Sequence, residues 1–480
     1  MQVANIRLNN YGFDYKKTGN KPARPVSVAD NSVPYQNVTS PAVSFLGISP
    51  KYLNAKQYIE RVKQIYEFLP PKNTDIYEFS LNNLDGIQEG IKVFDGLNMK
   101  EIAFLTRTMT EFGVNRGCHN MCSYCYADAK PPVKETAETI NKMSWNDFKS
   151  LTDGLNELND RLGFYVSGPN VSGKRNYISP FHDADGIEVA LKDNNGVEHD
   201  FIDIADELYK AVGVPVVFDT AGWTPSNKKL QERAERIAAH YSLPENESIL
   251  TQFNISLNPF QALHTRQVLL ERTGDIERAN KFKDLYENRM ANAIYTFTPM
   301  LESRKMGFIQ RVATSNEPVF DGFREADLQK MHKSIMKKVR VLYEKDLEGE
   351  QKFSKTSADV EGHLSQIKML MTGHVASGIT LAERGQELFG KANRHALETG
   401  DRAFSYNQRM ADAKNVKDIF YNGMNGIVDA NGDYYLTSWS ATFPTEIKLN
   451  FENKGKLTAP IRPYLQEDTP ITRTVINTVE

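Results

Sequence analysis

The stretch VNRGCHNMCSYCYADAK, residues 114–130, contains every cysteine of the 480-residue chain: Cys118, Cys122 and Cys125. An odd number of cysteines, in what we expect to be a reducing compartment, argues against a disulfide framework. Thiolates are soft ligands that suit zinc and iron–sulfur clusters. Spacings of four and three residues bring three sulfurs toward one centre, from a loop or from one face of a helix. The stretch therefore predicts a metal site or a catalytic thiol.

The number of sulfur ligands leaves two kinds of metal site open. A structural zinc ion normally takes four protein ligands, so zinc needs a histidine here, such as His119 or His182. A [4Fe–4S] cluster held by three cysteines leaves one iron without a protein ligand. Such an iron has no purpose in a purely structural cluster, but it has one where a small molecule binds to it.

Strand-like and helical runs alternate along the chain from about residue 106. The strand-like runs are GFYVSG (163–168), YISPF (177–181), VPVVFD (214–219), ILTQFNISL (249–257) and AIYTFT (293–298). The helical runs cover residues 145–162, 201–212, 228–240 and part of 276–295. This alternation predicts βαβ units and a parallel sheet. The pattern fits a doubly wound sheet as well as a full or partial barrel.

The rest of the chain differs from this α/β core in pattern. The predicted units are a disordered leader (1–50), a helical N-terminal extension (51–105), the core (106–325) and a mostly helical C-terminal region (326–480). Within the extension, helices are expected at 55–68 and, from apolar residues at helical spacing, at 84–105. Near the end of the chain, Asn431-Gly432 stands between alternating apolar arms, which predicts a β-hairpin.

The segment CHNMCSYC, residues 118–125, resembles the Cys-x3-Cys-x-aromatic-Cys signature of the radical SAM superfamily, with Tyr124 as the aromatic residue. The resemblance spans about residues 106–320. It implies an α/β fold, a partial (β/α)6 TIM-like barrel, with one [4Fe–4S] cluster on Cys118, Cys122 and Cys125. S-adenosyl-L-methionine would bind the fourth iron, with Tyr124 packed beside the cofactors. Reductive cleavage would then give a 5′-deoxyadenosyl radical that abstracts hydrogen from a substrate.

Polar residues follow the predicted strands, at the ends where barrels carry their catalytic groups. The family commonly has a Gly-Gly-Glu-like segment after the second strand that meets the amino group of S-adenosylmethionine. That segment is missing here, and Asp183 or Asp185 is a candidate for the same role. The resemblance also implies that Ser256, with Asn258 close by, contacts the ribose. The residues alone allow plainer roles, with Asp185 as a helix N-cap and Asn258 in a turn.

Three further residues have two interpretations each. Asp219 ends the strand-like run VPVVFD and Thr220 follows it, and the two residues belong to the site or cap the next helix. Arg266 pairs with the carboxylate of S-adenosylmethionine through two hydrogen bonds or lies on the surface.

Composition and charge narrow the class of protein. A net charge of −3 argues against a generally basic nucleic-acid binder. No run of ~18 apolar residues predicts a membrane span, and the N-terminus lacks the apolar core of a secretory signal, so we expect a cytoplasmic protein. No cysteine is left for an auxiliary cluster.

The resemblance leaves the substrate open among small molecules, peptides and RNA, and it implies a one-electron reductant such as flavodoxin or ferredoxin. The C-terminal region is the expected source of substrate specificity, since appended elements at a barrel mouth usually select the substrate. The alternative functions are an iron–sulfur electron-transfer protein and a zinc-binding structural protein, neither of which forms radicals.

Overall fold

The computed structural model describes ten continuous stretches: residues 86–120, 134–136, 139–162, 177–181, 184–259, 273–312, 324–348, 356–373, 425–437 and 442–457. It also describes positions 122, 125, 129, 131–132, 166, 262, 266, 270 and 376–377. Several predictions fall outside these residues: the leader, the helix at 55–68, nearly all of the strand at 163–168, and the positions of Tyr124, His182 and Asp183.

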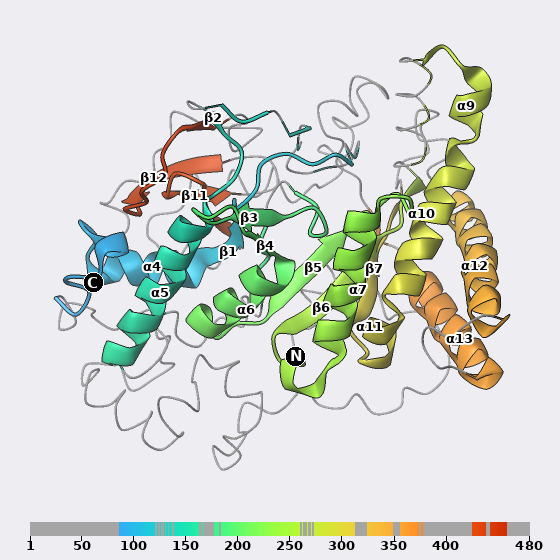
Figure 1. Ribbon diagram of the computed structural model, residues 1–480, viewed down its shortest axis with the longest axis horizontal. Coiled ribbons are helices and arrows are strands. Elements are labelled where there is room, and N and C mark those ends of the chain that lie inside the picture. The colour runs from blue at the N-terminus through green and yellow to red at the C-terminus, as the bar shows by residue number, and fades with distance from the viewer. Residues whose placement is uncertain are drawn as a thin grey trace.

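Parallel strands form the centre of the described chain (Figure 1). β5 (Val216–Thr220) pairs with β6 (Leu250–Ser256), which pairs with β7 (Met306–Ile309), all in parallel. Two isolated parallel bridges add two more segments to these strands. Ile178 pairs with Val216 of β5, and its neighbour Ser179 pairs with Glu111 of β1 (Met109–Phe112). Five chain segments thus follow one another side by side in sequence order.

The short strand β8 (Arg311–Val312) continues the chain of β7. It pairs in parallel with β9 (Ala376–Ser377), which is therefore the sixth parallel segment. Within the part of the chain that the structure describes, none of the sheets closes into a barrel. The predicted partial barrel therefore stays a prediction.

Helices stand between successive parallel segments. They are α5 (Trp145–Leu162), α6 (Phe201–Val212), α7 (Lys228–Ser242), α10 (Phe282–Thr296), α12 (Glu325–Glu348) and α13 (Ser357–Gly373). Local signals set their ends. Asp200 caps α6 by accepting a hydrogen bond from the Ile202 N–H, and Gly213 ends it with φ of 68°. The predicted bounds of α5 and α6 are confirmed.

Two predicted elements are wrong. AIYTFT forms the end of α10 and the start of α11, because the buried residues Tyr286, Met290 and Ile294 continue a helical spacing into it. The expected helix at 84–105 starts only at Met99, after a 3-10 turn and a left-handed Gly96 with φ of 84°. A capping box closes the N-terminus of this helix, α4 (Met99–Thr108).

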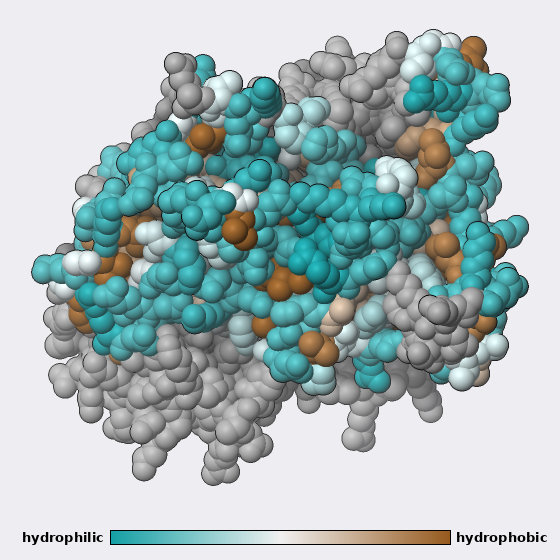
Figure 2. All heavy atoms as spheres, viewed as in Figure 1, coloured by the Kyte–Doolittle hydropathy of each residue, from teal (hydrophilic) through white to brown (hydrophobic). Residues whose placement is uncertain are grey.

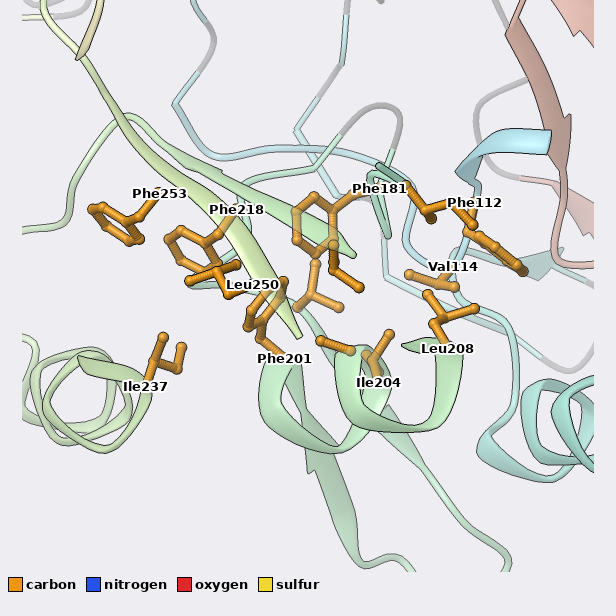
Figure 3. Packing of buried hydrophobic residues seen from close by; sticks show 14 of the residues in the cluster. Phe112, Val114, Phe181, Phe201, Ile204, Leu208, Phe218, Ile237, Leu250 and Phe253 are labelled. Carbon is orange, nitrogen blue, oxygen red and sulfur yellow. The ribbon is translucent and has the colours of Figure 1, made fainter. Parts of the chain in front are cut away.

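Aromatic rings fill the space between the parallel strands and the helices (Figure 3). Phe218 of β5 and Phe253 of β6 stack with ring centroids 4.8 Å apart. Phe201 of α6 meets Phe218 edge-on at 4.6 Å, and Phe181 lies 5.7 Å from Phe201. This layer fixes one side of the sheet against the helices, whose outward surface is mostly hydrophilic in the view of Figure 2.

A second sheet joins the far edge of β1 through a segment more than 300 residues away. β10 (Asn425–Val428) pairs with β1 in parallel, and β11 (Asp433–Thr437) and β12 (Thr442–Lys448) follow as antiparallel neighbours. The predicted turn at Asn431-Gly432 lies between β10 and β11. Beyond this sheet, the Asp147 carboxylate of α5 accepts the backbone N–H groups of Glu452 and Asn453.

The remaining described elements are short. They are η4 (Lys92–Phe94), β2 (Thr139–Ile140), β3 (Ala190–Lys192), β4 (Glu198–Asp200), η5 (Pro244–Asn246), α9 (Ile276–Asn280), α11 (Thr298–Glu302) and β13 (Lys456–Leu457). Among all helices in the described residues, none combines the length and the apolar character that crossing a membrane requires.

Candidate metal centre

The cysteine loop, residues 117–125, leaves the end of β1. The Gly113 N–H donates to the Val428 carbonyl at 2.7 Å, and the Arg116 N–H donates to the Asn141 carbonyl at 2.6 Å. Gly117 then turns the chain with φ of 91°, a value that glycine adopts without strain. The C-terminal sheet and the residues before α5 therefore hold the start of the loop on both sides.

The described backbone around the cysteines donates hydrogen bonds to two of the sulfurs. The Asn120 N–H donates to Cys118 Sγ and the Ala129 N–H to Cys125 Sγ, both at 3.4 Å. The Cys125 N–H also donates to the Cys122 carbonyl at 3.2 Å, which closes a tight turn between these two cysteines. Burial raises the pKa of the Cys118 thiol well above its ordinary value, and the charges of Asp185 and Glu188 raise it further.

Asn120 connects the cysteine loop to two other parts of the fold. Its Nδ2 donates to Asp185 Oδ2 at 2.7 Å, and its Oδ1 accepts from the Arg289 guanidinium of α10. The same guanidinium donates to the Gly222 carbonyl, directly after β5. A carboxylate only accepts and a guanidinium only donates, so the Asn120 amide must direct its NH2 group to Asp185 and its oxygen to Arg289.

Asp185 anchors this connection at the carboxyl end of β5. Its Oδ1 accepts from Thr220 Oγ1 at 2.7 Å and from the Ile187 N–H at 3.1 Å. Its Oδ2 accepts from the Ala221 N–H at 2.7 Å as well as from Asn120. Burial raises the pKa of Asp185, as does the Glu188 carboxylate. Asp185 thus caps the turn that follows it and positions the loop, and direct contact with a cofactor stays a prediction.

The carboxyl end of β6 carries the predicted residues Ser256 and Asn258. The Tyr286 hydroxyl of α10 donates to the Ser256 carbonyl at 3.2 Å and accepts from the Asn258 N–H at 3.1 Å. Burial raises the pKa of Tyr286. Tyr286 shares α10 with Arg289, which donates to Asn120 of the cysteine loop, so α10 connects the end of β6 to this loop.

The structure gives the other predicted residues the following places. His119 is exposed and pairs with Glu188 at 3.1 Å. Arg266 donates from Nε and Nη2 to Asn280 Oδ1 at 3.0 and 2.8 Å. The Asp219 carboxylate accepts from Asn254 Nδ2 at 2.6 Å.

Sequence reasoning missed three residues that hold the site together: Asn120, Tyr286 and Arg289. Asn120 was visible between two cysteines, but an asparagine in a loop has no distinctive pattern. Tyr286 and Arg289 are three residues apart, so they share one face of α10. That face gave no signal because nothing in the sequence placed it against the cysteine loop.

The donor set fits an iron–sulfur cluster by its chemistry, because three thiols lie in one loop and two accept N–H hydrogen bonds. Among the residues that the structure describes, no three His, Cys, Asp or Glu side chains are close enough together to hold a metal ion. The case for a cluster therefore depends on the donors and on their place in the fold.

Comparison with models of protein families, with curated proteins and with solved structures finds no match to this chain.

Proposed function

We propose that this protein is a radical SAM enzyme built on a partial (β/α)6 barrel, with a single [4Fe–4S] cluster. One observation carries the proposal. The cysteine loop follows the first of six parallel segments and is tied through Asn120 and Asp185 to the carboxyl end of a later one. Active sites of α/β barrels lie at this edge of the strands.

The proposed barrel takes its support from the order of the parallel pairs. β1, the bridge segment at Ile178 and Ser179, β5, β6 and β7 with β8 follow one another in the chain, and β9 comes last. Helices separate them, as the right-handed crossover connections of a parallel sheet require. Closure is not part of this proposal, since a partial barrel leaves one side open.

In the proposed centre, Cys118, Cys122 and Cys125 hold the cluster, which supplies the electron that cleaves S-adenosylmethionine when both are bound. The chain's own part is to position the loop and to limit solvent access. The Asn120 side-chain amide orients the loop, because it donates to the Asp185 carboxylate and accepts from the Arg289 guanidinium. Asp185 accepts from Asn120, Thr220 and Ala221, and so keeps the loop against the end of β5.

Cofactor contacts are proposed for five residues named from the sequence: Tyr124, Asp183, Asp185, Ser256 and Asn258. Ser256 and Asn258 lie beside Tyr286, whose hydroxyl binds the backbone of both. This link holds the end of β6 against α10, whose Arg289 donates to Asn120 of the cysteine loop, and a ribose contact is proposed beside this loop. The proposed partner is a one-electron reductant such as flavodoxin or ferredoxin, in the cytoplasm.

Spectroscopy of the reconstituted protein tests this proposal. The full chain is reconstituted anaerobically with iron and sulfide, and iron, sulfide and zinc are counted. The reduced protein is then examined by electron paramagnetic resonance with and without S-adenosylmethionine. We expect about four irons per chain and a reduced-cluster spectrum that changes when S-adenosylmethionine is added. The Cys122→Ser variant should lose the cluster.

Two other results would replace this proposal with a different function. A cluster whose spectrum is indifferent to S-adenosylmethionine indicates an electron-transfer protein. Bound zinc without iron indicates a structural zinc site, and His119→Ala would then test whether a histidine completes it.

A further inference from the structure

The C-terminal sheet meets the chain directly before the cysteine loop (Figure 1). β10 pairs in parallel with β1, and Phe112 at the end of β1 lies opposite Val428 at the end of β10. The contact continues at Gly113, whose N–H donates to the Val428 carbonyl at 2.7 Å. The C-terminal backbone therefore lies against residues 113–116, the root of the loop, which lead directly to Gly117 and Cys118.

Glycine at position 113 permits a close approach of two backbones. A Cβ added here would lie 3.1 Å from the Val428 carbonyl oxygen and 3.3 Å from Asp429 Cα. Both neighbours are backbone atoms, so neither can rotate away as the end of a side chain can. A glycine next to a strand often marks such an approach. Any larger residue at this position would push β10 away from the root of the loop.

Asp429 directly follows β10 and is fully buried. Its Oδ1 accepts from the Asn431 N–H at 2.8 Å and from the Asp433 N–H at 3.0 Å, so this oxygen shapes the turn between β10 and β11. Its Oδ2 has no hydrogen-bond partner among the described residues. An amide oxygen would serve the turn equally well, so the turn does not account for a buried negative charge.

A buried positive charge lies against the same glycine. Arg116 is only 1% exposed, and its Nη2 lies 3.7 Å from the position of the added Cβ at Gly113. Burial raises the pKa of Asp429 to about 6, with a further rise from the Asp433 charge and an opposing effect of the Arg116 guanidinium. A buried charge costs much free energy unless an opposite charge compensates for it. The Asp429 carboxylate supplies an opposite charge to Arg116.

We propose that the C-terminal sheet positions the cysteine loop, with Gly113 providing the backbone contact and Asp429 keeping the Arg116 guanidinium inside the fold. Cys118 comes two residues after Arg116. A guanidinium that loses a buried counter-charge is drawn toward water, and the chain up to Cys118 moves with it. Gly113 and Asp429 are therefore positioning residues, which act on the thiols through the root of the loop.

This role differs from the substrate selection that the sequence leads us to expect of the C-terminal region. It makes metal binding near the start of the core depend on a strand that follows more than 300 residues later. The identity of the loop as the site of a cluster rests on the proposed function. The position of the thiols does not, because their reactivity can be measured in the metal-free chain.

Alkylation of the metal-free full chain measures how firmly the loop is held. The chain is treated with iodoacetamide at pH 8, and labelling of each cysteine is followed over time by mass spectrometry. Cys118 should react slowly in the wild type, because burial raises the pKa of its thiol and the thiolate is the reactive form. Asp429→Asn removes the charge but keeps an acceptor for the turn, and Gly113→Ala separates the two backbones. Each should speed labelling of Cys118 at least tenfold.

The matched control is Asp200→Asn. Asp200 is also a buried aspartate that accepts a backbone N–H, from Ile202, and it lies 3.8 Å from the buried Arg233 guanidinium, but it belongs to α6 and α7. It should lower stability and leave the labelling of Cys118 unchanged. Urea unfolding shows that each variant folds and allows comparison at matched stability. After reconstitution, the electron paramagnetic resonance spectrum of the reduced cluster should change in Asp429→Asn and Gly113→Ala and not in the control.

The inference is overturned if either folded variant is labelled at the wild-type rate, or if Asp200→Asn speeds labelling equally at matched stability. It is also overturned if Cys118 of the wild type already reacts like a cysteine of the unfolded chain. Gly113→Ala decides alone if Asp429→Asn fails to fold. Labelling needs neither a cluster nor S-adenosylmethionine, so a chain that protects Cys118 but binds no iron keeps this inference and loses the radical SAM function.

Discussion

Asn120 is the residue whose removal tests the architecture of the candidate centre most sharply. Asn120→Ala deletes one hydrogen bond to the Asp185 carboxylate and one to the Arg289 guanidinium. Hydrogen bonds to charged groups contribute about 1.5–3 kcal/mol each. The partners keep other bonds, with Asp185 still accepting from Ala221 and Arg289 still donating to Gly222. We therefore expect the free energy of unfolding to fall by about 3–4 kcal/mol, the lower part of the summed range of about 3–6 kcal/mol.

A matched asparagine separates this effect from a general loss of stability. Asn159 of α5 is buried, donates to the Ala211 carbonyl at 2.9 Å and accepts from the Val166 N–H at 2.7 Å. Asn159→Ala removes two hydrogen bonds as well and leaves a cavity, so its cost in stability is about 2–3 kcal/mol. Its partners, Ala211 of α6 and Val166 in the turn after α5, lie outside the cysteine loop.

The assay is urea unfolding of both variants together with iron content after reconstitution. Both variants should unfold at lower urea concentration than the wild type. Only Asn120→Ala should also lose iron, by about half or more, because its loop is no longer held against β5. Equal iron in the two variants, at matched stability, would refute the role assigned to Asn120.

Two further predictions concern stability alone. His332 is buried, neither of its ring nitrogens has a hydrogen-bond partner among the described residues, and burial lowers its pKa to about 4. The unfolded histidine, with its pKa of about 6.5, takes up a proton first, so stability falls with pH below 6.5, by about 2 kcal/mol at pH 5. His332→Leu should remove this part of the difference in urea unfolding between pH 7.5 and pH 5, and an unchanged difference would contradict the assignment. Gly154→Ala in α5 places a Cβ 2.5 Å from Val93 Cγ1 and should lower the free energy of unfolding by about 1–3 kcal/mol. The Cβ of Gly362→Ala in α13 meets nothing within 4 Å, so this variant should raise the free energy of unfolding by up to about 1 kcal/mol. Thermal unfolding of the two glycine variants decides this, and a stabilised Gly154→Ala would show that the packing against Val93 is loose.

The helices of the core were the most predictable elements, for local reasons. α5 and α6 match their predicted bounds because an apolar stripe and nearby caps determine them, as Asp200 and Gly213 show for α6. The run AIYTFT was misread because aromatic and β-branched residues favour strands, whereas burial of Met290 and Ile294 on one helical face decided the outcome.

Long-range pairings were beyond the reach of sequence patterns. Nothing local to β10 shows that it joins β1, from which it is separated by more than 300 residues. The same limit applies to the centre itself. The expectation that strand ends gather polar residues led to Asp185 and Asn258, but the joint formed by Asn120 and Arg289 depends on how α10 lies against the cysteine loop.

Quantifying 5′-deoxyadenosine is the most direct test of the central claim. The reconstituted, reduced protein is incubated with S-adenosylmethionine, and the product is measured by chromatography for the wild type and for Cys118→Ala, Cys122→Ala and Cys125→Ala. The radical SAM function predicts 5′-deoxyadenosine from the wild type and none from the three variants. A fully loaded wild-type cluster that forms no 5′-deoxyadenosine would contradict it.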